Sequence, residues 1–311
     1  MSDRRESRGI RLRLPATSAN LGPGFDAVAV ALDFFLEIEA EAAEAFSIVA
    51  AGRNADRCGR LEDNLILETY RNLLRDEGRE VIPLSIRLAN AIPLGMGCGS
   101  SAAARLAAIA LANHFGQLGW NTDRILEAAY ALEGHPDNVA ACWLGGFVAA
   151  VPEGKCVRAM RVDPPQDWRA IVTLPAEPLS TSKAREMLRA SYPLDDVVAN
   201  LQSVATLVLA FAQGRGDLLR LAMADRIHQP YRAPFCPLFP LLLPLVGTHS
   251  ILGVSLSGAG PAVLAIIDGE NGLGPAGSAI QRAGENGIQL ELLKCRFSGA
   301  GARQLIEIKS Y

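Results

Sequence analysis

Apolar and polar positions alternate at the start of the chain and predict a half-buried β-strand over residues 10–14. Pro15 is expected to end this strand, and a polar, glycine-rich loop is expected over residues 16–26. Further strands are predicted at 28–39, 85–88, 147–151, 170–174, 253–257, 262–267, 289–296 and 304–308.

Helical spacing is clearest over residues 64–77, where Leu65, Ile66 and Tyr70 fall on one face. The Ala-rich run at 102–113 predicts a buried helix that neighbours approach closely, because its side chains are small. Strands and helices mix without strict alternation, so an α+β fold is favoured over a doubly wound sheet. The other predicted helices lie at 122–133, 139–144, 183–190, 196–212, 217–224 and 275–285.

The length of 311 residues allows one large domain or two ordinary ones, with a core that needs no disulfide or metal. The composition changes at residues 163–167, which read Asp-Pro-Pro-Gln-Asp. We therefore predict one domain over 1–163 and a second over 164–311.

The charge balance gives no footprint for nucleic acid, because 30 Lys+Arg stand against 33 Asp+Glu and the net charge is −3. No stretch reaches the roughly 18 uninterrupted apolar residues of a membrane-spanning helix, and no secretory signal opens the chain. The six cysteines lack C-x-x-C spacing and the density of a secreted scaffold. We expect reduced thiols in a cytoplasmic protein, with neither nucleic acid nor membrane as a partner.

Lysine is scarce, with Lys155, Lys183, Lys294 and Lys309 as its four occurrences. A P-loop needs Lys directly after the second Gly of G-x-x-x-x-G-K-[ST], and a protein kinase needs a strand Lys. None of the four meets the P-loop pattern. Lys155 follows a glycine but is itself followed by Cys156, and no other lysine follows a glycine. If the protein handles ATP, it does so in another way.

The loop at 93–101 is the strongest local signal for chemistry. Gly95, Gly97 and Gly99 let the backbone curve tightly, and two serines then begin a helix whose N-terminus suits an anion such as a triphosphate. A glycine-rich turn with a Ser cap explains the same residues equally well. Two further glycine clusters, at 21–26 and 257–261, favour one phosphate-lined cleft over three unrelated turns.

Together, the segments 15–26, 93–103, 133–139 and 257–261 resemble the ordered motifs of the GHMP kinase superfamily. The first and third segments, with residues 181–185, point within it to the homoserine kinases. The resemblance covers the chain from about residue 10 to its end. It implies an α+β GHMP kinase fold, with an N-terminal ribosomal protein S5 domain 2 fold that contains a left-handed crossover, and a C-terminal ferredoxin-like domain.

The resemblance also implies a reaction. Homoserine kinases make O-phospho-L-homoserine from ATP and L-homoserine, with Mg²⁺, on the pathway to threonine. A homodimer is expected at the level of the family. Other GHMP kinases, which act on mevalonate-type, isoprenoid or sugar alcohols, remain the alternative, and a non-catalytic GHMP-fold regulator is a more distant one.

L-homoserine carries a carboxylate, an ammonium and a hydroxyl, so its site needs a fixed cation, a fixed anion and a group that aims the hydroxyl. The resemblance assigns the carboxylate to Arg185 and Arg232, since the Arg fork binds two oxygens at once. It assigns the ammonium to Asp26 and the reacting hydroxyl to Asn138. The other residues implied at the substrate are Asn20, His135 and Thr181.

The resemblance places the phosphates on the loop and the helix start, with Asn64 at the adenine, although a helix N-cap explains Asn64 equally well. Mg²⁺ is expected at Ser101 and Glu133, with Glu127 as the ungapped alternative. The residues implied at the nucleotide are Asn64, Pro93, Leu94, Gly95, Met96, Gly97, Cys98, Gly99, Ser100, Ser101, Ala102, Ala103, Gly258 and Gly260.

The catalytic group implied by the resemblance consists of Asn138, Asp137 and Arg185. Asp137 is assigned first to a structural or electrostatic role, and a role as general base stays open. The other histidines, His114, His228 and His249, are expected to be structural.

Overall fold

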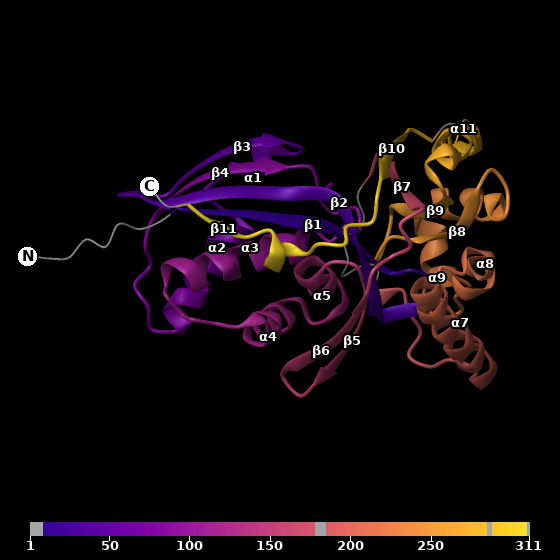
Figure 1. Cartoon of the computed structure of the whole chain (residues 1–311), viewed down its shortest axis with the longest axis horizontal. Helices are drawn as coiled ribbons and strands as arrows, with labels where there is room; N and C mark the ends of the chain where they lie inside the picture. The colour runs from indigo at the N-terminus through magenta and orange to yellow at the C-terminus, as the bar shows by residue number, and fades with distance from the viewer. Residues whose placement is uncertain (1–8, 178–184, 285–287, 310–311) are drawn as a thin grey trace, which may run out of the picture.

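The computed structural model describes residues 9–177, 185–284 and 288–309. Two lobes lie side by side along the long axis, each built on one β-sheet (Figure 1). The first sheet has the order β11-β1-β2-β4-β3, and β5 pairs with β2 and with β6. Its strands are β1 (Ile10–Asn20), β2 (Gly24–Ala42), β3 (Ser47–Gly52), β4 (Leu84–Asn90), β5 (Phe147–Glu153), β6 (Cys156–Val162) and β11 (Glu307–Ile308).

The first strand does not end at Pro15, as the sequence predicts, but continues to Asn20. The pairing with β2 shifts register between Pro15 and Ala16, so that the proline sits at an irregularity of the ladder. Proline lacks the N–H that a regular ladder uses, and a bulge is where a strand tolerates it. The extension carries residues 16–20, predicted to be loop, into the middle of the molecule.

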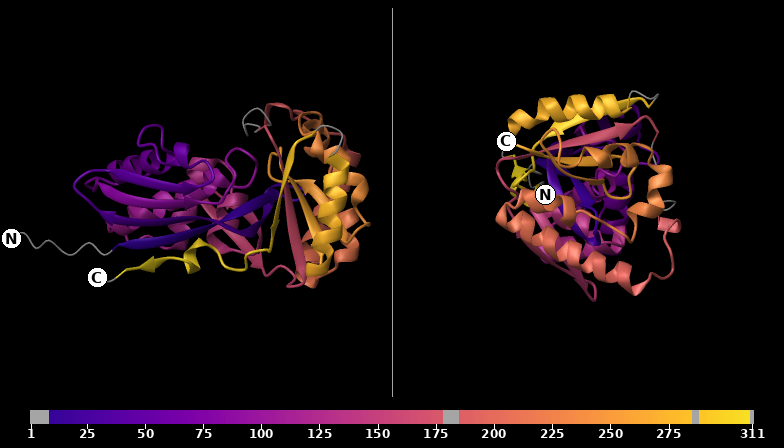
Figure 2. Two further views of the ribbon diagram at one scale, coloured as in Figure 1. Left: turned by 90° about the horizontal axis from the view of Figure 1, so that it is seen from above. Right: turned by 90° about the vertical axis from the view of Figure 1, so that its right-hand side faces the viewer.

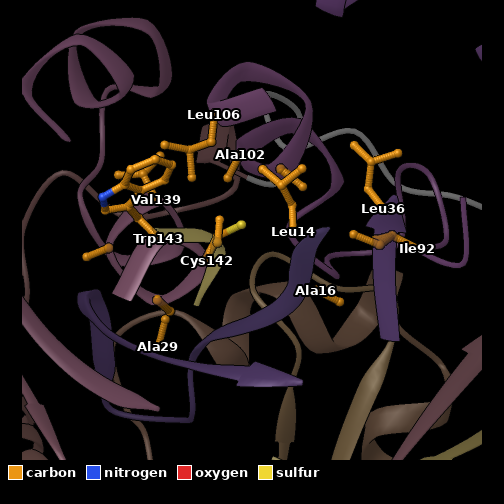
Figure 3. Packing of buried hydrophobic residues seen from close by; sticks show 14 of the residues in the cluster. Leu14, Ala16, Ala29, Leu36, Ile92, Ala102, Leu106, Val139, Cys142 and Trp143 are labelled. Atoms are coloured by element: carbon orange, nitrogen blue, oxygen red, sulfur yellow. The ribbon is translucent and has the colours of Figure 1, made fainter. Parts of the chain in front are cut away.

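Helices cover one face of the first sheet and close the main core (Figure 3). In α3, Ala102 and Leu106 pack near Leu14 of β1, and Val139 and Trp143 of α5 fill the space beside them. The small side chains of α3 bring these elements close together, as the Ala-rich run predicts. The helices are α1 (Ala55–Cys58), α2 (Leu65–Asp76), α3 (Ser100–Phe115), α4 (Thr122–Glu133) and α5 (Asp137–Leu144).

The second sheet is antiparallel, with the order β10-β7-β9-β8. Along the chain its four strands come in the order β7, β8, β9 and β10. Across the sheet the order is therefore fourth, first, third, second, which is that of a ferredoxin-like domain. Helices cover the side of this sheet that faces away from the first lobe (Figure 2). The strands are β7 (Trp168–Pro175), β8 (Ile251–Leu256), β9 (Val263–Asp268) and β10 (Leu290–Cys295).

The helices of this lobe are α7 (Leu194–Gln213), α8 (Leu219–Ala222), α9 (Gln229–Arg232), α10 (Leu238–Leu242) and α11 (Leu273–Gly284). The short 3₁₀ helices of the chain are Gly216–Leu218, Ala233–Phe235, Leu243–Leu245, Glu270–Gly272 and Ala302–Gln304. The predicted helix at 183–190 begins outside the described residues. The predicted strand at 304–308 is shorter than expected, since β11 holds two residues and a 3₁₀ turn precedes it.

Among the described residues, α7 is the one helix long and apolar enough to cross a membrane by length and composition, and 17% of that stretch is buried. Its buried side packs within the protein. The ring of Phe211 stacks on Phe147 of β5 with centroids 4.2 Å apart and meets Trp168 of β7 edge-on at 5.1 Å. This aromatic cluster joins the two lobes.

The end of the chain returns to the first lobe. The N–H of Gly146 donates to Ser298 O at 2.8 Å, and that of Ser298 donates to Ala31 O at 2.9 Å. The final strand then pairs antiparallel with β1. The chain leaves the first sheet after Val162 and enters the second at Trp168. It returns to the first sheet at β11. Of the two predicted domains, 1–163 and 164–311, the second therefore contains a strand of the first sheet.

Candidate active site

The glycine-rich loop between β4 and α3 has a backbone that suits glycine. Gly95, Gly97 and Gly99 have φ angles of 72°, 83° and 70°. A Cβ on Gly97 would lie 2.1 Å from the carbonyl oxygen of Ser257, and one on Gly99 would lie 1.9 Å from Oγ1 of Thr17. At these two glycines the loop lies so close to Ser257 and Thr17 that a side chain would not fit. The loop then runs directly into the N-terminus of α3.

Two carbonyl oxygens of this loop are bound by donors of the protein. Met96 O accepts a hydrogen bond from the N–H of Ala262 at 3.2 Å, and Cys98 O accepts one from the N–H of Thr17 at 3.1 Å. A carbonyl oxygen repels phosphate, whereas N–H groups at a helix start attract it. The arrangement is the one that an anion site requires.

The three glycine-rich segments meet around one cavity of about 370 Å³. The N–H of Gly258 donates to Ala19 O at 3.0 Å, and the amide of Asn20 donates to Gly258 O at 2.8 Å. The predicted site residues that line this cavity are Asn20, Asp26, Gly95, Gly97, Gly99, Ser100, Ser101, Ala102, Glu133, His135, Asp137, Asn138, Arg185, Arg232 and Gly258.

Some predicted residues lie elsewhere. Thr181 is outside the described residues. Pro93 and Met96 line a separate cavity of about 650 Å³ between the loop and the ends of β7 and β10. Cys98 and Ala103 are 1% and 0% exposed, so their side chains belong to the core beneath the loop. Gly260 packs against the Sγ of a buried cysteine in the second lobe, and Asn64 and Leu94 line the cavity described next.

A third cavity, of about 260 Å³, adjoins the start of α3, and its walls include Leu88, Ile92, Leu94 and Asn64. The Asn64 side chain accepts from two N–H groups of the first turn of α2 and donates to two carbonyls of the preceding loop. This amide is therefore the N-cap of α2. The apolar walls beside it suit a flat heteroaromatic ring such as adenine.

Opposite charges gather on the wall of the cavity of about 370 Å³, where Asp26, Arg185 and Arg232 lie. Nη2 of Arg185 lies 2.9 Å from each carboxylate oxygen of Asp26. The Phe25 ring lies near two cations, with its centroid 5.2 Å from Cζ of Arg185 and 5.3 Å from Cζ of Arg232. Arg232 is 2% exposed, and burial together with the nearby Arg185 charge lowers the pKa of its guanidinium.

Asn20 serves the fold of this corner. Its backbone has φ of 72°, and its Oδ1 accepts from the N–H of Asp26 at 3.1 Å. Since its amide nitrogen also binds Gly258 O, the side chain holds the turn that presents Asp26. Asn20 thus positions a predicted ammonium ligand.

A polar network at the start of α5 holds the predicted hydroxyl-binding residue. Asn138 Oδ1 accepts from the hydroxyl of Thr17 at 2.6 Å. Oδ1 of the buried Asp137 accepts from the N–H of Asn138 at 2.7 Å and lies 2.9 Å from Nδ1 of His135. That hydrogen bond, with the carboxylates nearby, raises the pKa of His135 against the opposing effect of burial.

The two predicted Mg²⁺ ligands touch each other. The hydroxyl of Ser101 donates to Oε1 of Glu133 at 2.6 Å, and Nε of Arg105 lies 2.9 Å from the same oxygen. The alternative ligand, Glu127, pairs with Arg124 on the outside of α4 at 3.1 Å. Within the described ranges, no cluster of three or more His, Cys, Asp or Glu side chains has metal-site geometry.

The sequence did not single out Phe25, Thr17 or Arg105, each of which contacts a predicted site residue. Phe25 and Thr17 lie inside the first recognised motif, but neither residue type signals a function by itself. Arg105 follows Ser101 by four residues on α3 and so shares its face, a spacing that could have drawn attention to it. Its place beside Glu133 is set by the packing of α3 against α4.

Comparison with known proteins agrees with this geometry. Residues 64–146 match the family model for the GHMP kinases N terminal domain. Homoserine kinase of Solibacter usitatus is 42% identical over 258 residues, which cover 83% of this chain and 84% of that protein. Homoserine kinase of Thermus thermophilus is 40% identical over 95% of this chain and 94% of that protein.

The chain belongs to the homoserine kinase family. Solved structures support the fold: a homoserine kinase from Cytophaga hutchinsonii has a TM-score of 0.79 at 24% identity and covers 99% of both chains. The phosphomevalonate kinase of Streptococcus pneumoniae has a TM-score of 0.68 at 14% identity, over 93% of this chain and 99% of that one. The predicted GHMP kinase fold is confirmed, and because kinases of other substrates share it, the fold alone does not select homoserine.

Proposed function

We propose that this kinase transfers the γ-phosphoryl group of ATP to the side-chain hydroxyl of L-homoserine, and that Arg185, Arg232 and Asp26 recognise the amino-acid end of the substrate. The product is O-phospho-L-homoserine, an intermediate of threonine biosynthesis. The observation that carries the proposal is that two guanidinium groups and one carboxylate line the same cavity as the glycine-rich loop.

The two arginines suit the substrate carboxylate because a guanidinium offers a planar fork of N–H donors. Asp26 suits the ammonium, which needs a hydrogen-bond acceptor with negative charge. A mevalonate-type substrate has a carboxylate but no ammonium, so it would leave Asp26 without its role. A sugar alcohol would use neither charge, and two buried or half-buried cations would then be costly to keep.

Asn138 is the residue we assign to the reacting hydroxyl. The hydrogen bond from Thr17 fixes its amide oxygen. Its amide nitrogen donates one hydrogen to Asp137 Oδ1 at 3.4 Å and has a second hydrogen for the hydroxyl oxygen. Asp137 already accepts from the backbone of Asn138 and contacts His135. We therefore assign Asp137 to positioning these two neighbours, since phosphoryl transfer depends mainly on alignment and on neutralising charge.

Ser101 and Glu133 are the residues we propose for Mg²⁺. A hydroxyl and a carboxylate are hard oxygen ligands, and they already meet at 2.6 Å beside the phosphate loop. Mg²⁺ usually takes one or two protein ligands and completes its shell with water and substrate phosphates. When bound, it would neutralise phosphate charge. The Arg105 guanidinium, 2.9 Å from the same Glu133 oxygen, helps to hold that carboxylate in place.

We further propose a cytoplasmic location and a homodimer. All six cysteines are free thiols in the structure, which suits a reducing compartment. The dimer rests on the family resemblance alone, and light scattering of the purified protein would give its mass.

The test of the reaction is product identification. Purified protein is incubated with ATP and Mg²⁺ and with L-homoserine, mevalonate, galactose or shikimate in separate samples. Mass spectrometry should find a phosphate monoester of homoserine and of none of the other three. A phosphorylated product from another alcohol, with homoserine unchanged, would overturn the proposal.

A further inference from the structure

A fully buried histidine connects the two sides of the substrate cavity. His228 is 0% exposed and precedes α9, which contains Arg232. Its Nε2 lies 2.7 Å from the carbonyl oxygen of Gly22, in the turn between β1 and β2. Its Nδ1 lies 3.1 Å from Nη1 of Arg232. The histidine therefore contacts both the turn of the first lobe and the buried arginine of the second.

These two contacts fix the protonation of the ring. A carbonyl oxygen can only accept a hydrogen bond, so Nε2 of His228 must carry a hydrogen and donate to Gly22 O. A guanidinium can only donate, so Nδ1 must offer its lone pair to Arg232. His228 is thus a neutral imidazole of the Nε2–H tautomer, held by a partner at each nitrogen.

The surroundings of the ring agree with a neutral form. The Asp225 side chain is 0% exposed and lies 3.5 Å from Nε2 of His228, which favours a charged ring. Its oxygens, however, accept from the N–H groups of residues 227, 228 and 229. Burial and the Arg232 charge outweigh the effect of Asp225 and lower the pKa of His228.

The contact with Arg232 matters because a long side chain must be ordered before it can bind well. An Arg side chain has about 2 kcal/mol of rotamer freedom, and a buried guanidinium needs acceptors around it. His228 supplies one acceptor and also contacts Phe25, with ring centroids 5.4 Å apart. The same Phe25 ring lies against Arg232 and Arg185. The Phe25 ring therefore lies near both arginines proposed for the substrate carboxylate.

We propose that His228 is a positioning residue of the homoserine site, whose Nδ1 lone pair fixes the Arg232 guanidinium for the substrate carboxylate. Its Nε2–H anchors the ring on the turn that leads into β2, the strand of Asp26, so that Arg232 and Asp26 are held in a set relation. The inference deepens the proposed function and rests on the assignment of Arg232 to the carboxylate.

Two substitutions separate the two hydrogen bonds. In His228→Asn, Oδ1 takes the place of Nδ1 and can still accept from Arg232, but the donor to Gly22 O is lost. In His228→Gln, the amide nitrogen takes the place of Nε2 and can still donate to Gly22 O, but the acceptor for Arg232 is lost. The pair is matched in polarity and is measured alongside Arg232→Ala.

We expect His228→Gln to raise KM for homoserine about tenfold or more, the loss of one hydrogen bond to a charged group, and to leave KM for ATP within about twofold. His228→Asn should raise KM for homoserine less. The double variant of His228→Gln with Arg232→Ala should have the KM of Arg232→Ala alone, because the histidine acts through the arginine. Equal KM values in the two His228 variants, or additive effects in the double variant, would overturn the inference.

The controls separate this inference from the proposal beneath it. If Arg232→Ala leaves KM for homoserine unchanged, the assignment of Arg232 fails. If Arg232→Ala raises KM and His228→Gln does not, only the role of His228 fails. Should the variants not fold, ¹⁵N-histidine NMR of the wild-type protein decides: a neutral Nε2–H ring at position 228 is expected, and an imidazolium or an Nδ1–H ring would contradict the inference.

Discussion

Nη2 of Arg185 lies 2.9 Å from both carboxylate oxygens of Asp26, so the two residues assigned to the oppositely charged groups of the substrate bind each other. Their side chains are 48% and 30% exposed. Exposed ion pairs of this kind contribute roughly 0–1 kcal/mol, so a zwitterion can replace the pair at small cost. The substrate carboxylate would take Arg185 and its ammonium would take Asp26, which exchanges one ion pair for two.

Substitution of either partner should therefore impair binding of homoserine. We expect Arg185→Ala and Asp26→Asn each to raise KM for homoserine about 10- to 150-fold, the equivalent of about 1.5–3 kcal/mol for a charge-assisted hydrogen bond, with KM for ATP nearly unchanged. Arg215→Ala is the control, because Arg215 pairs with Asp217 on an exposed surface of the same lobe. Steady-state kinetics with each substrate varied in turn makes the measurement, and an unchanged KM for homoserine removes that residue from the site.

The two candidate Mg²⁺ ligands on α4 can be told apart by the metal dependence of the rate. Glu133→Gln removes the carboxylate that meets Ser101, and we expect it to raise the Mg²⁺ concentration for half-maximal activity about tenfold, a loss of roughly 1.4 kcal/mol. Glu127→Gln should leave it unchanged, because Glu127 pairs with Arg124 on the surface. The reverse result in Mg²⁺ titrations would assign the metal to Glu127.

The phosphate loop lies close to the turn at 257–261, and we therefore expect Gly97 to be sensitive to substitution. In Gly97→Ala a Cβ would meet Ser257 O at 2.1 Å, in a backbone with φ of 83°. A strained residue of this kind costs of order 1–3 kcal/mol, and we expect kcat/KM for ATP to fall about tenfold or more. Gly274→Ala is the control, since a Cβ on this α11 residue meets nothing within 4 Å. Equal activity of the two variants would show that the loop does not need its observed path.

The raised pKa of His135 predicts how its contribution to stability depends on pH. Its hydrogen bond to Asp137 favours the charged ring. A group with a raised pKa in the folded state stabilises the fold fully below its unfolded value, about 6.5 for His, and less as pH rises through the folded value. The difference in Tm between wild type and His135→Gln should therefore be largest below about pH 6 and shrink above neutrality. A difference that is constant or grows with pH would contradict the ion pair.

Much of the fold could be predicted from local pattern. The helix at 122–133 coincides with α4 (Thr122–Glu133), and α3 is the buried Ala-rich helix that its composition indicates. The predicted end of β1 at Pro15 is wrong. Proline is tolerated there at a bulge, which depends on the partner strand and not on the residue itself. The place of β11 in the first sheet depends on a long-range pairing with β1, which no local pattern contains.

The parts of the site that lie in sequence motifs could be predicted. The parts that depend on contacts between the two lobes could not. The three glycine-rich segments could be expected to meet, and they surround one cavity. The sequence predicts an ordinary structural role for His228, since a single histidine before a short helix gives no signal. Its contacts with Gly22 and Arg232 span more than 200 positions in one case and four in the other, and only the folded chain brings them together.

The most direct test that both charges of the substrate are recognised compares L-homoserine with two analogues that each lack one charge. 4-Hydroxybutyrate keeps the carboxylate and the hydroxyl, and 3-aminopropan-1-ol keeps the ammonium and the hydroxyl. The rate of ADP release by the wild-type protein is measured with each at a range of concentrations. We expect kcat/KM to fall about tenfold or more for each analogue, since each loses a charge-assisted contact, and a rate with either analogue equal to that with homoserine would contradict recognition by Arg185, Arg232 and Asp26.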